Sequence, residues 1–248
     1  MSATDSALSA RPARGATLSA LYRLLLRTQL TVARVLGIAA LSSLSVLLGV
    51  FSRWDSAPEQ AAADAIASYG LALVVPLATL WLGTAAIGDL VEDRLLVYLW
   101  LKPVPRWQLP AAAVLATASV LVPLTAVPIA VTALVAGAGE VAPAALLAAA
   151  LAGLAYAGVF VAAGLWFRRA AWWGLAFVLL WENAVAHLAE GSARFTIVGW
   201  ASSILASAPD IDVSLAAGSA AAAVIILPAI AIVGWLAATM RYQRADID

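Results

Sequence analysis

The sequence predicts an all-α, polytopic membrane protein with about six transmembrane helices. Of its 248 residues, 64% are hydrophobic and only 11% are charged, and the mean hydropathy is +0.97. A soluble domain is nearer half apolar and a quarter charged, and one domain of this size has too little interior to bury the excess. Because a bilayer supplies that apolar environment, we expect a single transmembrane domain over residues 17–240.

Six apolar segments are long enough to cross the hydrocarbon core of a bilayer, which takes about 20 residues at about 1.5 Å per residue. The expected spans are residues 35–51, 69–90, 109–136, 142–167, 170–190 and 213–239. Pro123 and Pro128 predict a kink in the third span, because proline cannot donate a backbone hydrogen bond. Small residues recur every four positions in the fourth span and would permit close helix approach, although an alanine-rich chain produces such ridges by chance: Ala145, Ala149, Gly153 and Ala157.

Both ends of the chain are polar. Residues 1–16 are expected to form a disordered cytoplasmic tail, and residues 241–248 a second cytoplasmic tail. Residues 17–34 predict an amphipathic helix with Arg23, Arg27 and Arg34 on one stripe and leucines opposite. Two interpretations stay open: a helix that lies in the membrane interface, or a cytoplasmic extension of the first span.

The basic residues are unevenly distributed between the predicted loops. With the N-terminus inside, twelve Lys and Arg residues fall in cytoplasmic segments and only Arg53 and Arg194 fall outside. The positive-inside rule therefore places both termini in the cytoplasm. Thirteen of the fourteen basic residues are arginine, which hints at a GC-rich bacterium, so we expect a multi-pass protein of the bacterial cytoplasmic membrane. The first thirty residues lack the pattern of a cleaved signal peptide.

The loop between spans two and three carries more than a connection needs. Acidic residues stand where the second span ends, and an apolar run from Leu95 to Leu101 is followed by Lys102 and a Pro-Val-Pro stop. This composition suits a short helix that docks into a groove on a cytoplasmic partner. The alternative is a helix on the lipid interface, with Lys102 and Arg106 facing phosphates.

The order of an acidic pair, a leucine-rich run, a basic residue and Pro-Val-x-Arg resembles a loop of the ABC-2 type transporter permeases, the membrane subunits of ATP-driven exporters. Aligned on Pro103, Glu92 falls on the family glutamate, Leu96 on its leucine and Arg106 on its arginine, while Arg94 and Leu95 replace the usual Gly-Thr. The resemblance implies a cytoplasmic coupling helix that contacts the ATPase through Glu92, Asp93, Leu96, Leu99, Trp100, Pro103 and Arg106. It also implies that the outer stretch from Phe195 to Ala206 forms a short re-entrant pair of helices.

The resemblance further implies three partners: a cytoplasmic ABC ATPase subunit, a second permease protomer in a homo- or heterodimer, and membrane lipid, with no nucleic acid. A phosphate-binding loop needs glycines and a lysine, and the one lysine, Lys102, is followed by proline with no such loop before it. We therefore expect ATP and magnesium on the partner ATPase and no cofactor on this chain.

Few residues could support chemistry inside the membrane. The chain has no cysteine and a single histidine, His187, which disfavours zinc sites and serine hydrolysis. Glu182 and Asn183 fall about 18 Å from the cytoplasmic end of the fifth span at about 1.5 Å per residue. A carboxylate there is costly and is a candidate functional site, although a hydrogen-bonded Glu182 that tightens helix packing explains it equally well. The leading hypothesis is thus an ABC exporter permease that is not itself an enzyme. The alternative is an ion- or proton-coupled carrier or channel that uses Glu182.

Overall fold

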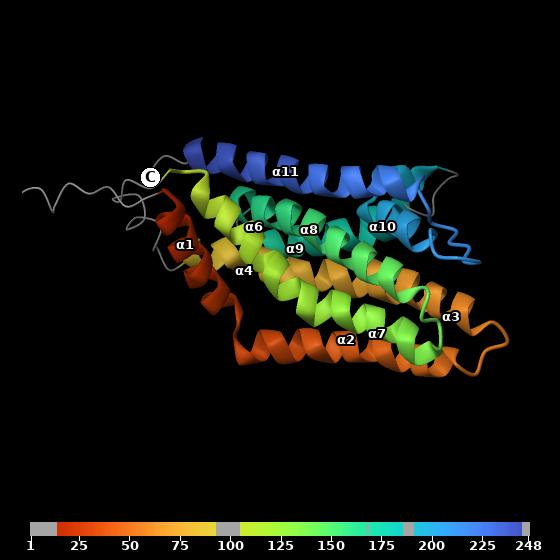
Figure 1. Cartoon of the computed structure of the whole chain (residues 1–248). Helices are drawn as coiled ribbons and strands as arrows, with labels where there is room; N and C mark the ends of the chain where they lie inside the picture. Colours follow the sequence, from red (N-terminus) through yellow and green to blue (C-terminus); the bar gives the residue numbers. More distant parts are fainter. Residues whose placement is uncertain (1–13, 93–104, 168, 186–190, 245–248) are drawn as a thin grey trace, which may run out of the picture.

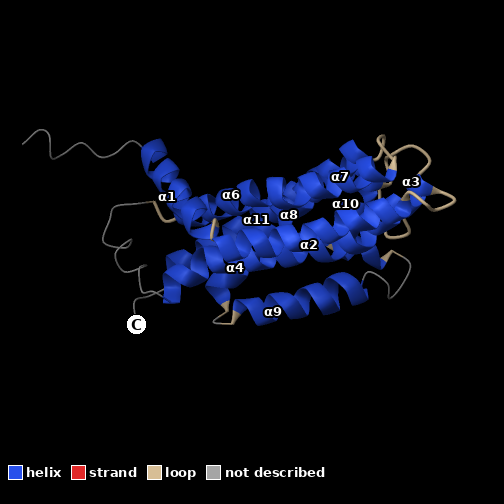
Figure 2. Ribbon diagram, turned by 90° about the horizontal axis from the view of Figure 1, so that it is seen from below, coloured by secondary structure: helices blue, strands red, loops and turns tan. Residues whose placement is uncertain are grey.

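The computed structural model describes residues 14–92, 105–167, 169–185 and 191–244, and these form helices and turns without a strand (Figure 2). The long helices run side by side in one bundle, and α1 (Arg14–Gln29) lies across one end of it (Figure 1). We call this end, which also holds the last turn of α11 (Ala220–Arg244), the terminal end. The opposite end, beside α3 (Pro58–Ala65), is the distal end.

Within the described residues, the chain is all-helical and five helices are long and apolar enough to cross a membrane, which confirms the predicted all-α class. Their bounds are Val32–Ser52, Pro58–Ala86, Gln108–Ala136, Ala142–Trp166 and Ala220–Arg244. The predicted span 170–190 is described as α9 (Ala170–Ala176) followed by the π-helical η3 (Phe177–Ala184). Residues 186–190 lie outside the described residues, so a sixth span stays a prediction.

The second span begins earlier than predicted, at Pro58 rather than at residue 69. Helix α3 continues through the π-helical η1 (Ile66–Val74) into α4 (Val75–Glu92). Proline at the first helical position loses no intrahelical hydrogen bond, and Glu59 in the first turn suits the positive end of the helix dipole. The polar residues near Pro58 therefore made the predicted span start too late.

Helix α11, which corresponds to the predicted span 213–239, begins at Ala220 rather than at residue 213. The Ala217 N–H donates to the Gly199 carbonyl at 3.1 Å and to the Ser203 hydroxyl at 2.9 Å. Both acceptors belong to α10 (Ile197–Leu205), so this segment is bound to α10 instead of starting α11. Helix α11 also runs on to Arg244, which moves the start of the predicted tail from 241 to beyond that residue.

Helix α1 is separate from α2 (Val32–Ser52), because Thr31 is extended, with φ −86° and ψ 145°. The helix begins at Arg14 and ends at Gln29 rather than spanning 17–34, and the interpretation as an extension of the first span is wrong. Leu21 and Leu25 are buried in a cluster with α6 (Gln108–Leu121), while Arg23 and Arg27 are exposed. The predicted amphipathic face is thus packed on the bundle.

The third span departs from α-helical geometry where the prolines predict it. Between α6 and α7 (Val127–Ala136) lies the π-helical η2 (Val122–Ala126), which contains Pro123, and Pro128 follows near the start of α7. A proline lacks the N–H that would bond four residues back, so the hydrogen-bond ladder shifts there.

Helix α8 (Ala142–Trp166) lies at the centre and packs against α4, α6, α7, α10 and α11. The small-residue ridge predicted on it is buried throughout, at Ala145, Ala149, Gly153 and Ala157. A close approach of two helices lies one residue beyond this ridge, where Gly158 meets α11. A Cβ on Gly158 would stand 2.6 Å from the Ala231 carbonyl oxygen, and one on Gly234 would overlap the Gly158 backbone. Two helices thus come together backbone to backbone.

Three serines of α2 form two kinds of hydrogen bond, to a neighbouring helix and within their own helix. Ser42 donates to the Leu124 carbonyl at 2.7 Å, and the Ser45 and Thr132 hydroxyls lie 3.0 Å apart, so both face the third span. Ser43 is exposed and donates within its own helix to the Ala40 carbonyl at 2.8 Å.

Candidate functional site

The loop with the permease-like motif joins α4 to α6 at the terminal end (Figure 1). Five of its predicted contact residues lie outside the described residues: Asp93, Leu96, Leu99, Trp100 and Pro103. Glu92 is the last residue of α4, and Arg106 stands in the turn before α6. The structure therefore places both ends of the loop beside α1 and the last turn of α11.

Arg106 links the C-terminal end of this loop to α11. Its guanidinium donates to the Gln243 carbonyl at 2.8 Å. The next residue, Trp107, packs edge-to-face on Trp235 with ring centroids 6.4 Å apart, and the Trp235 indole N–H donates to the Trp107 carbonyl at 3.3 Å. A displacement of the loop would therefore be passed to α11 as well as to α4 and α6.

Glu182 lies on η3 and is 1% exposed. One carboxylate oxygen accepts the Ile197 N–H at 3.1 Å, and the other accepts the Val198 N–H at 3.0 Å. These residues open α10, where backbone donors have no intrahelical acceptor and a negative charge meets the positive end of the helix dipole. The Thr196 hydroxyl accepts the next amide, of Gly199, at 3.0 Å. Glu182 therefore caps α10 from a neighbouring helix.

Asn183 does not share this site, although it is adjacent in sequence. Its side-chain amide donates to the Val178 carbonyl at 2.8 Å, within its own helix, and the side chain is half-buried. The structure therefore gives the two predicted intramembrane polar residues different partners.

Tyr156, on α8, is a neighbour of Glu182 that the sequence did not reveal. Its ring is buried and stacks on Phe160 with centroids 5.7 Å apart. The hydroxyl lies close enough to Glu182 to interact electrostatically but makes no hydrogen bond of standard geometry with a described residue. The one available signal was a tyrosine in the middle of an alanine-rich span.

Further hydrogen bonds hold α10 in place. We call residues 192–218 the distal cap. The Trp181 indole donates to the Phe195 carbonyl at 3.1 Å, and the Arg194 guanidinium donates to the Ala217 carbonyl at 3.1 Å. The Ser203 hydroxyl accepts the N–H groups of Ala217 and Gly218 at 2.9 and 3.1 Å. The segments before and after α10 are thus both held by hydrogen bonds.

The predicted re-entrant pair is a 3₁₀ turn, Ser192–Phe195, followed by one α-helix, α10. The chain after Leu205 forms turns, so a second α-helix is absent from the described cap. Farther along this segment, the amides of Ala217 and Gly218 are bound to the Ser203 hydroxyl of α10. Helix α10 packs on α8 and α11 and is buried along most of its length.

In the described part of the chain, no group of three or more His, Cys, Asp or Glu side chains is placed to hold a metal ion. No protein-family model matches the chain, and no curated protein matches it.

Proposed function

We propose that the chain is the transmembrane permease subunit of an ATP-driven ABC transporter, an exporter of the bacterial cytoplasmic membrane. The observation that carries the proposal is the motif-bearing loop, whose two ends, at Glu92 and Arg106, lie at the terminal end and are joined to α11 through Arg106. A partner that binds this loop would contact the bundle where three of its long helices begin or end.

The charge distribution supports a cytoplasmic terminal end. Exposed arginines of the described residues gather there, on α1, before α9 and on the last turn of α11: Arg23, Arg27, Arg169, Arg241 and Arg244. The distal end holds Arg53 and Arg194, and Arg194 is bound to the Ala217 carbonyl. Positive charge on one side is the pattern of cytoplasmic loops.

The packing gives a path from the loop to the centre of the bundle. Helix α4 meets α8 through small residues, since a Cβ on Gly83 would stand 3.0 Å from Phe160 and one on Gly164 would stand 3.3 Å from the Thr84 carbonyl. Helix α8 in turn meets α11 at Gly158. Close backbone contacts of this kind transmit displacement rather than absorb it. ATP hydrolysis, with its magnesium, would take place on the partner ATPase, and a second protomer would complete the pathway.

Glu182 does not favour the alternative of an ion- or proton-coupled carrier. Both of its carboxylate oxygens already accept backbone amides of α10. A carboxylate that carries ions or protons must change its partners, whereas this one is engaged on both oxygens by fixed donors.

The test is co-expression and co-purification with a candidate ABC ATPase. Wild type is compared with a Glu92→Ala, Arg106→Ala double variant and with a matched Arg53→Ala, Glu59→Ala control, which removes one exposed charge of each sign near the distal end. We expect the ATPase to co-purify with wild type and control, and to be lost or uncoupled in the double variant. Failure of wild type to bind the ATPase under every nucleotide condition would overturn the proposal.

A further inference from the structure

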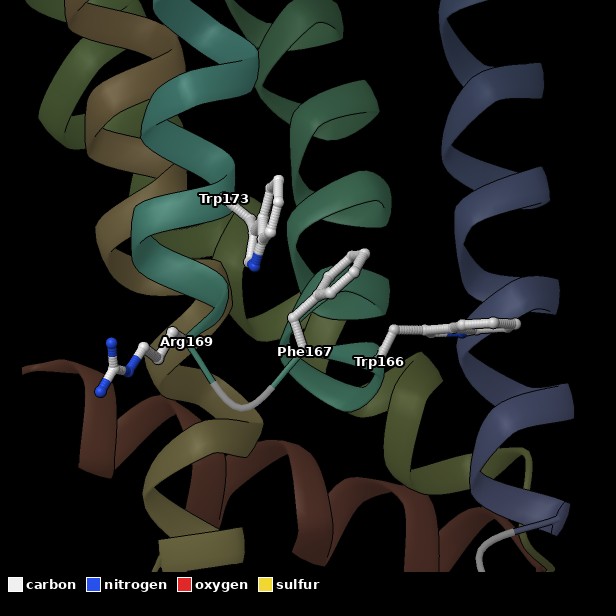
Figure 3. Close-up of a pocket in the computed structure, with 4 residues that line it drawn as sticks. All are labelled: Trp166, Phe167, Arg169 and Trp173. Atoms are coloured by element: carbon white, nitrogen blue, oxygen red, sulfur yellow. The ribbon is translucent and has the colours of Figure 1, made fainter.

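A pocket of about 550 Å³ opens at the terminal end, between the end of α8 and the start of α9 (Figure 3). Its lining is three aromatic side chains and one arginine: Trp166, Phe167, Trp173 and Arg169. The volume lies within the range of pockets that hold a small organic molecule. None of these four described lining residues belongs to the motif-bearing loop or to the distal cap.

The pocket is amphipathic. The rings of Phe167 and Trp173 lie 5.8 Å apart at 33°, and Figure 3 shows Arg169 projecting away from the rings. On the other side, Trp166 points toward α11, where the Arg241 guanidinium lies 5.9 Å from its ring centroid. An apolar surface thus has a cation on each side of it.

The aromatic side chains are unusually open to the surroundings of the bundle. Trp173 is 62% exposed, and the adjoining Trp172 is 72% exposed. Tryptophan at the end of a membrane span sits at the headgroup level, where its apolar ring and polar N–H are both accommodated. In the orientation of the proposed function, the pocket would therefore lie at the depth of phospholipid glycerol and phosphate groups.

The two arginines are available to bind an anion. Within the described residues, neither Arg169 nor Arg241 forms an ion pair with a carboxylate. A guanidinium binds phosphate through two parallel hydrogen bonds, and it can do so while it also stacks on an aromatic ring. Arg241 already makes such a contact with Trp166.

We propose that this pocket binds one anionic phospholipid of the cytoplasmic leaflet, an assignment that rests on the orientation in the proposed function. Arg169 binds the phosphate, Arg241 adds attraction from α11, and the acyl chains lie along Phe167 and Trp173. A soluble phosphate would meet a mostly aromatic lining and few donors, whereas a lipid satisfies the cationic edge and the rings together. The feature that carries the inference is one cavity lined by exposed rings and by Arg169, with Arg241 beside the lining residue Trp166, neither arginine forming an ion pair within the described residues.

Native mass spectrometry of the purified chain, without ATPase, tests the proposal. The protein is incubated in detergent with phosphatidylglycerol or with phosphatidylcholine of the same acyl chains. Wild type should retain one phosphatidylglycerol at least fivefold more than phosphatidylcholine. Arg169→Gln should lose this preference and Arg169→Lys should keep part of it. Arg27→Gln, which removes an exposed arginine of α1 at the same end, should behave as wild type.

Equal retention of the two lipids, or equal effects of Arg169→Gln and Arg27→Gln, would overturn the site and leave only non-selective annular lipid. Glycerol 3-phosphate is the competing probe. Displacement of phosphatidylglycerol by equimolar glycerol 3-phosphate would identify a soluble phosphate ligand and contradict the lipid assignment. Because the assay contains no ATPase, a failure here leaves the co-purification result standing, and a failed co-purification leaves this result standing.

Discussion

At the distal end of the bundle, the carboxylate of Glu182 and the hydroxyl of Ser203 together accept four backbone N–H groups. At the terminal end, Arg169 and Arg241 form no ion pair with a described carboxylate, and the neighbouring tryptophans are exposed. Glu182 and Ser203 thus face inward at the distal end, whereas Arg169 and Arg241 face outward at the terminal end. The two distal side chains form hydrogen bonds within the chain, whereas the two terminal arginines are available to ligands and partners.

This contrast separates two kinds of polar residue in a membrane protein. A buried polar group must find its partner inside the chain, because the lipid offers none. A group at the interface has water, phosphate and partner proteins as alternatives. The sequence marks Glu182 as a candidate site because a carboxylate in an apolar span is energetically costly. In the structure, its hydrogen bonds are those of a helix cap. The residues expected to carry function lie at the other end.

The largest effect should come from Glu182→Ala. It leaves the Ile197 and Val198 amides buried without an acceptor, and each such group costs about 1–3 kcal/mol. Glu182→Gln retains one carbonyl acceptor, so its stability should lie between those of wild type and Glu182→Ala. The measurement is thermal unfolding in detergent, with the exposed Glu59→Ala as control. If Glu182→Ala unfolds at the same temperature as Glu59→Ala, the capping role is wrong.

A smaller loss is expected for Ser203→Ala, at about 1–2 kcal/mol. The Gly218 amide loses its acceptor, but the Ala217 amide keeps a second one, the Gly199 carbonyl at 3.1 Å. Amide hydrogen exchange should increase at residues 217 and 218 in this variant. Ser43→Ala, whose hydroxyl is exposed and bonds within its own helix, is the matched control. Unchanged exchange at both amides would show that Ser203 does not hold the cap.

At the terminal end, Arg106→Gln should separate stability from coupling. Its hydrogen bond to the Gln243 carbonyl is exposed, so its loss should cost about 1 kcal/mol or less. Under the proposed function, the same change should abolish stimulation of the co-purified ATPase. Unfolding temperature and ATPase rate are measured on one preparation. A large loss of stability, or a fully stimulated ATPase, would contradict this division.

The smallest effect concerns the distal turn at Asp55. Hydrogen bonds from the Ala57 N–H and the Ser56 hydroxyl lower the pKa of this exposed carboxyl. Because the folded pKa lies below the unfolded value of about 3.9, the turn is stabilised above that value and loses this contribution as the pH falls through the folded pKa. The Ala57 amide resonance should therefore titrate in wild type at a pH below the ordinary pKa of an aspartate. In Asp55→Asn it should not, and an equal titration there would refute the assignment.

Hydropathy predicted the spans because lipid-facing helices must be apolar, but polarity misplaced two of their boundaries. Glu59 and Gln60 fall before the predicted span 69–90, although Pro58 and the alanines beside them favour a helix start. Residues 213–219 suggested a span, although their amides are bound by α10. The break between α1 and α2 falls at Leu30 and Thr31, where no glycine or proline predicts the end of a helix.

The candidate site was predictable only in part, for a related reason. The cost of a carboxylate in an apolar span identified Glu182, but its partners follow fifteen and sixteen residues later, on another helix. No local pattern predicts such a contact. Likewise, Tyr156 comes near Glu182 only because α8 packs centrally. The aromatic pocket draws on residues close in sequence, yet its pairing with Arg241 depends on how α8 and α11 meet.

Hydrogen–deuterium exchange of the purified chain, with and without the candidate ATPase, tests the contrast between the two ends most directly. The account predicts that peptides covering residues 88–107 gain protection when the ATPase binds, while peptides covering the distal cap keep their exchange rates. Protection confined to the distal cap, or none at residues 88–107 in a complex that demonstrably forms, would contradict it.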